Sequence, residues 1–104
     1  MVADASNDVL HDPREPLHGL RLRHAALAVL LRARRPLLVP EVLADLSSRG
    51  YVPGGANPSK ALADALAVEV RRGRAVRLRR GLYATGRIPR TTAWRILGGS
   101  THLR

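Results

Sequence analysis

Arginines dominate the last third of this 104-residue sequence. From position 71 onward the chain holds ten arginines and neither Asp nor Glu, because its last carboxylate is Glu69. A guanidinium group is always charged and donates N–H groups in a planar fork, which suits it to phosphate and carboxylate oxygens. The net charge of +10 is therefore concentrated in one segment. This predicts a polyanionic partner, such as nucleic acid, anionic lipid or an acidic protein.

A genome rich in G and C offers an alternative explanation, because it raises arginine content throughout a protein. The ratio of 17 Arg to one Lys fits such a bias. The bias does not explain the missing carboxylates after position 69, because Asp and Glu codons are also available to such genomes. We therefore favour binding to a polyanion.

The remaining residues suggest no catalytic site, cofactor or metal site. Without cysteine the chain has no disulfide, thiolate zinc site or thiol nucleophile. The four histidines lack the spacing of metal ligands, and Gly54-Gly55 is not followed by the Gly-Lys-Ser/Thr of a phosphate loop. We expect a protein that is not an enzyme.

No stretch approaches the roughly 18 apolar residues of a membrane span. The N-terminus is acidic and has no apolar region typical of a signal peptide. We expect a cytoplasmic protein of the nucleoid, with no membrane contact. Residues 1–18 are interpreted as an acidic flexible tail, 19–97 as one domain and 98–104 as a flexible C-terminus.

Three helices are predicted in the first part of the domain. Leu20, Leu27 and Leu31, with Ala26 and Leu30, give an apolar stripe typical of a helix. After a very short strand at 37–39, Pro40 and Glu41 favour the start of a second helix, which Gly50 ends. Asn57 and Pro58 are typical of an N-cap and first turn, and the third helix is expected to run to Arg72.

Beyond Gly73 the apolar period changes from 3.6 to 2, which predicts strands. Val76 and Leu78 are expected on the inner face and Arg77 and Arg79 on the outer face, with a turn at Arg80-Gly81. A second strand follows at 82–85. Thr91 is expected to cap a short last helix over 92–97, whose Trp94 is expected to anchor on the core.

This order of elements predicts a mainly α fold with a small β-hairpin: a winged helix-turn-helix with a three-helix core, a two- to three-stranded wing sheet and a short C-terminal helix. The segments PLLVPEVLADLSSRGY and NPSKALADALAVEVRRGRAVRLRRGLYA resemble the HARE helix-turn-helix family of chromatin and transcription proteins. The segment VRLRRGLYA is also similar to the N-terminal winged helix of AbiEi-type antitoxins. These resemblances imply the fold, and they imply DNA binding only by analogy.

We expect binding to double-stranded DNA as a transcriptional regulator or nucleoid-associated protein, mostly through phosphates and with weak sequence selectivity. RNA, or docking on RNA polymerase or another acidic protein, stays open as an alternative. The oligomeric state is not predicted. The expected contact residues are Ser59, Lys60, Arg71, Arg72, Arg74, Arg77, Arg79, Arg80, Arg87 and Arg90.

Overall fold

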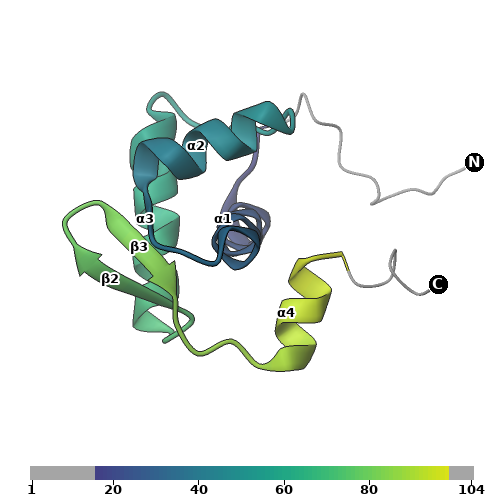
Figure 1. Cartoon of the computed structure of the whole chain (residues 1–104). Coiled ribbons are helices and arrows are strands. Elements are labelled where there is room, and N and C mark those ends of the chain that lie inside the picture. The colour runs from purple at the N-terminus through teal and green to yellow at the C-terminus, as the bar shows by residue number, and fades with distance from the viewer. Residues whose placement is uncertain (1–15, 99–104) are drawn as a thin grey trace, which may run out of the picture.

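The computed structural model describes residues 16–98 of the chain. The described part contains four helices and a small three-stranded antiparallel sheet (Figure 1). The predicted order of elements is confirmed. The elements are α1 (Gly19–Ala33), β1 (Leu37–Leu38), α2 (Val39–Ser48), α3 (Pro58–Arg71), β2 (Ala75–Arg79), β3 (Leu82–Thr85) and α4 (Arg90–Ile96).

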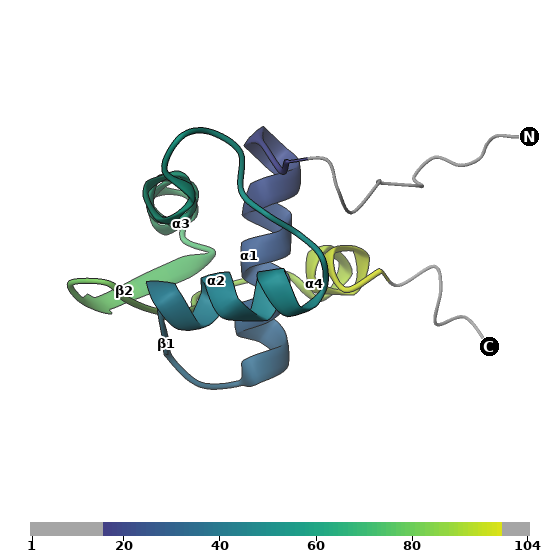
Figure 2. The same ribbon diagram turned by 90° about the horizontal axis from the view of Figure 1, so that it is seen from above.

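Helix α1 lies in the middle of the molecule, between α3 on one side and α4 on the other (Figure 2). Residues 26–30 of α1 are consequently buried in an unbroken run, although only one apolar stripe was predicted. The predicted stripe was wrong at its start, because Leu20 is 52% exposed and Leu22 faces the core instead. A helix covered on two sides buries more than one face, which the sequence period alone does not reveal.

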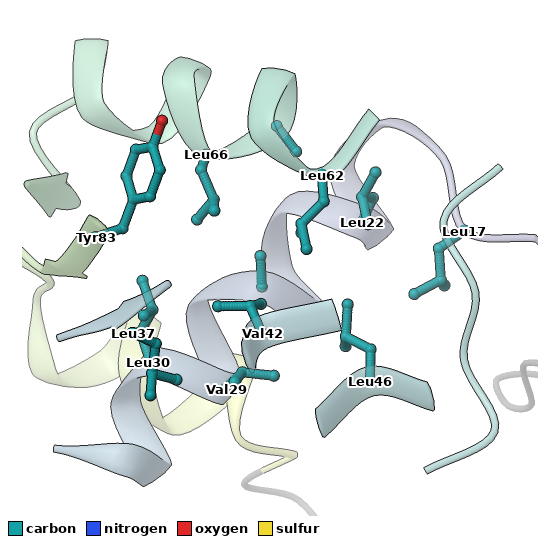
Figure 3. Packing of buried hydrophobic residues seen from close by; sticks show 12 residues of the cluster. Leu17, Leu22, Val29, Leu30, Leu37, Val42, Leu46, Leu62, Leu66 and Tyr83 are labelled. Atoms are coloured by element: carbon teal, nitrogen blue, oxygen red, sulfur yellow. The ribbon is translucent and has the colours of Figure 1, made fainter. Parts of the chain in front are cut away.

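The main core joins the three longest helices to the sheet. Leu30 of α1, Val42 of α2 and Leu66 of α3 are fully buried in it, together with Tyr83 of β3 (Figure 3). Leucine, valine and alanine fill nearly all of this core, as expected for a chain with no phenylalanine.

Local sequence signals explain the helix boundaries. The side chain of Asn57 accepts a hydrogen bond from the backbone N–H of Lys60 at 3.1 Å and caps α3, as predicted. Glu41 accepts from the backbone N–H of Leu38 at 2.8 Å at the start of α2. Gly50 follows α2 with a φ of 84°, the left-handed conformation expected for a residue that ends a helix.

The domain includes Leu17, which the sequence placed in the N-terminal tail. Leu17 is only 4% exposed, and its backbone exchanges hydrogen bonds of 2.8 Å with Val52 and Gly54. The assignment of Leu17 to a flexible tail was therefore wrong, because its side chain is part of the core and its backbone is hydrogen-bonded to the loop after α2. The rest of the predicted tail, and residues 99–104, lie outside the described residues.

The sheet has the order β1-β3-β2, with Tyr83 of β3 opposite both Leu37 of β1 and Arg77 of β2. The hairpin of β2 and β3 projects away from α1 (Figure 1). The predicted inner positions of Val76 and Leu78 were wrong: both are exposed, Leu78 by 54%. Val76 is opposite Ala84, on the face of the hairpin that points away from the side of the buried Tyr83, and Leu78 lies at the irregularity between Arg77 and Arg79.

Helix α4 packs on α1 and begins at Arg90, two residues before the predicted start. Pro89 precedes it as the N-cap, so Thr91 is part of the helix and does not cap it. Trp94 is 47% exposed, which contradicts its expected role as a core anchor. Ile96 contributes instead to the surface that faces α1. Across residues 16–98, no helix combines the length and hydrophobicity that crossing a bilayer requires.

Candidate nucleic-acid interface

Six exposed arginines extend from the C-terminal end of α3 along the hairpin, and we call them the basic band. Each is exposed, and within residues 16–98 none has a carboxylate within ion-pairing distance. Their charge is therefore available to an external anion. The basic band consists of Arg71, Arg72, Arg77, Arg79, Arg80 and Arg87.

The hairpin distributes its arginines over two faces. Arg77 is paired with Tyr83, whereas Arg79 is paired with Leu82 because the register shifts between Arg77 and Arg79. Residues that are directly opposite in an antiparallel pair share a face. Arg77 therefore lies on the same face as the buried Tyr83, and Arg79 on the other. The predicted common outer face of Arg77 and Arg79 was wrong, because a bulge changes the strict alternation of side chains.

The base of the hairpin is fixed against the end of α3. The backbone N–H of Arg87 donates to the carbonyl of Gly73, and that of Gly86 donates to Arg74, both at 2.8 Å. A Cβ on Gly86 would lie 2.5 Å from the carbonyl oxygen of Gly73, so only glycine permits this approach. The contact brings Arg87 beside Arg72, although 15 positions separate them in the sequence.

A shallow hollow of about 500 Å³ opens at this contact. It is lined by Arg72 and Arg87 from the basic band, by Arg74, and by Pro89 and Thr92 at the start of α4. Two guanidinium groups and a hydroxyl around one hollow form a donor set that fits phosphate oxygens. Arg90 begins α4 and directly follows Pro89, which lines the hollow, and its side chain is exposed.

Arg74 does not have the role that the sequence predicted. Its Nη2 donates to Oε2 of Glu69 at 3.0 Å and its Nε donates to Oε1, while its side chain is only 18% exposed. Glu69 is fully buried and also accepts from Nη1 of Arg23 on α1 at 3.2 Å. Arg74 is therefore held inside the fold by a carboxylate and is not part of the basic band.

The ionisation of Glu69 is maintained by these two arginines. Burial raises the pKa of Glu69, but the hydrogen bonds and charge of Arg74 and the charge of Arg23 lower that pKa by more, so it lies below its ordinary value. The same hydrogen bonds raise the pKa of Arg74. The cluster joins α1, α3 and the start of β2.

The ion pair of Glu69 with Arg23 was not predicted from the sequence. A signal was present, because Glu69 lies within the buried stripe of α3, between Leu66 and Val70. A carboxylate at a core position needs a cation from a neighbouring element. Nothing in the sequence indicates which arginine supplies it.

Ser59 and Lys60 are exposed but lie at the opposite end of α3 from Arg71. A helix of that length separates the two ends by about 20 Å. Nζ of Lys60 is 3.0 Å from Oδ2 of Asp64, so the two residues form an exposed ion pair within α3. The structure thus places Ser59 and Lys60 apart from the basic band.

Among the described residues, no three His, Asp or Glu side chains are close enough to hold a metal ion. Comparison with models of known families, with curated proteins and with solved structures found no match for this chain.

Proposed function

We propose that this chain is a winged-helix protein that binds duplex DNA mainly through its phosphates. The observation that carries the proposal is the basic band: six exposed guanidinium groups without carboxylate partners in the described part of the chain. Salt bridges neutralise each of the four acids at 41, 45, 64 and 69, so no described carboxylate remains to repel a phosphate.

In this proposal α2 and α3 form the helix-turn-helix pair, and the hairpin of β2 and β3 is the wing. A recognition helix lies in the major groove, and a wing contacts the adjacent backbone or minor groove. Because Arg77 and Arg79 point to opposite faces of the hairpin, a wing that enters a groove can contact phosphates on both of its sides. The resemblance of the sequence to the HARE family supports the same arrangement.

Weak sequence selectivity follows from the exposed face of α3. That face carries Lys60, already paired with Asp64, and half-buried Ala63 and Ala67, followed by Arg71. Alanine has no donor or acceptor for a base edge. A general role in transcription or in organising the nucleoid fits this surface better than recognition of one operator.

An acidic protein partner, such as RNA polymerase, is a second candidate. It is favoured by the exposed apolar side chains of Val76 and Leu78 between the arginines of the hairpin. Exposed apolar groups inside a charged rim are typical of protein interfaces.

The test compares two triple variants that remove the same charge. Binding of a random-sequence duplex is measured by mobility shift at about 100 mM salt. The variant R77Q/R79Q/R80Q should weaken binding by more than about tenfold, whereas the matched variant R32Q/R49Q/R95Q should bind nearly as the unaltered protein does. Equal losses in both variants, or none in the first, would contradict the proposal. Retained binding to polymerase but not to DNA would favour the second candidate.

A further inference from the structure

A second cavity lies away from the basic band, between α1, the C-terminal end of α2 and α4. Its volume is about 800 Å³, within the range of pockets that bind small molecules. Helix α4 forms one wall through Arg95 and Ile96. Figure 2 shows that α4 is on the opposite side of α1 from α3.

The rim of this cavity is strongly basic. Of residues 16–98, four arginines line it, Arg21, Arg32, Arg49 and Arg95, and no carboxylate does. Asp45 forms ion pairs with two of them: its Oδ1 is 2.7 Å from Nε of Arg49 and 3.9 Å from Nη2 of Arg32. Among the described residues, Arg32 and Arg49 thus share one carboxylate, and Arg95 adds a further positive charge to the rim.

The pKa of Arg32 is affected by the positive charge around the rim. Burial and then the charge of Arg49 lower the pKa of Arg32, and the opposing charges of Asp45 and Tyr51 do not restore it to its ordinary value. A bound anion would relieve this repulsion. His24, also on the wall, has a pKa lowered by burial and by the charge of Arg74. A neutral imidazole adds a hydrogen-bonding group without adding charge.

The floor of the cavity is apolar. Ala28 and Leu46 are buried side chains that line it, and Ile96 contributes from α4. Two small alanines, Ala25 and Ala28, leave room above the surface of α1. An inorganic anion alone would leave this floor in contact with water, so the cavity fits a ligand that has both an anionic group and an apolar body.

We propose that this cavity binds a small organic anion with an apolar chain, an alkyl carboxylate or alkyl phosphate, whose head group is held by the arginines of the rim. The inference does not depend on DNA binding, because the two surfaces share no residue. A ligand in this position contacts α1, α2 and α4 together. It therefore restrains α4, the helix that follows the hollow beside Arg87.

Trp94, the one tryptophan of the chain, provides the measurement because it is next to Arg95 on α4. Decanoate and decyl phosphate, both below their micelle concentrations, are titrated into the full chain. Tryptophan fluorescence and calorimetry should both show saturable binding of one ligand per chain. Decanol and inorganic phosphate each lack one half of the ligand and should bind at least about tenfold more weakly.

The two triple variants then locate the site. R32Q/R49Q/R95Q should lose at least about tenfold in affinity for decanoate, whereas R77Q/R79Q/R80Q should bind it unchanged. The variant Ala28→Met, which narrows the cavity without changing charge, should also weaken binding, and circular dichroism establishes whether each variant is folded. If Ala28→Met does not fold, the affinity of R32Q/R49Q/R95Q for decanoate is the measurement that tests the site.

Several outcomes would overturn the inference: no saturable binding, equal binding of decanol, or undiminished binding by R32Q/R49Q/R95Q. Vesicles of phosphatidylglycerol form a further arm. Binding to vesicles without binding to free decanoate would assign the basic rim to a lipid surface and overturn the proposal of a small ligand. Because DNA binding is measured with the other triple variant, failure of one proposal leaves the other intact.

Discussion

Arg74 binds both carboxylate oxygens of Glu69, through Nε to Oε1 and through Nη2 to Oε2 at 3.0 Å. The pair fixes the end of α3 relative to the beginning of β2, and Arg23 extends it to α1. The hairpin that carries Arg77, Arg79 and Arg80 begins one residue after Arg74. A buried ion pair thus positions the exposed arginines.

Glu69→Gln should destabilise the domain by about 3 kcal/mol at neutral pH, because it leaves two partly buried guanidinium groups without their anion. The free energy of unfolding in urea measures this. Asp64→Asn is the matched control, since it breaks an exposed ion pair with Lys60 and should cost less than about 0.5 kcal/mol. The lowered pKa of Glu69 gives stability that is complete above the ordinary value of 4.5 and is lost as the pH falls through the folded-state pKa. Equal costs for the two variants would contradict this role of Glu69.

His24 should make the domain less stable at mildly acidic pH. Its pKa in the folded protein is lowered below 6.5, chiefly by burial and then by the charge of Arg74. As the pH falls below about 6.5, the unfolded chain takes up a proton that the folded chain does not, and stability is lost until the folded-state pKa is passed. Urea unfolding at a series of pH values should show this loss, and His24→Gln should remove it. An NMR titration in which His24 titrates at or above 6.5 would refute the prediction.

The stabilities of alanine variants at Leu17 and Leu20 show where the folded domain begins. Leu17→Ala should cost about 2–3 kcal/mol because it creates a cavity in the core. Leu20→Ala should change stability by less than about 0.5 kcal/mol, because Leu20 is mostly in solvent. Thermal unfolding of the two variants checks the difference. The reverse order would restore the sequence interpretation, in which Leu20 is in the core and Leu17 in the tail.

The helices and their boundaries could be predicted from the sequence because each depends on residues close together in the chain. Asn57 caps α3 through a backbone group three residues away. Gly50 adopts a left-handed conformation that favours glycine whatever residues surround it. The hairpin turn at Arg80-Gly81 was predicted on the same basis, and Gly81 has a φ of 75°.

The errors concern contacts between residues far apart in the sequence. Whether Arg74 faces solvent depends on Glu69 and on Arg23, which is 51 positions away. Alternation along β2 indicates that Val76 and Arg77 lie on opposite faces, but it does not specify which face shares the side of the buried Tyr83. The exposure of Trp94 likewise depends on how α4 packs on α1. The bulge that separates Arg77 from Arg79 leaves no signal in the apolar pattern.

The salt dependence of binding to a duplex tests most directly whether the basic band contacts DNA phosphates. With the six arginines of the basic band in contact, a plot of log affinity against log salt concentration should have a slope of about −5. For R77Q/R79Q/R80Q, the slope should be less steep by about 2–3. A slope shallower than about −2 for the unaltered protein would contradict a phosphate interface of this size.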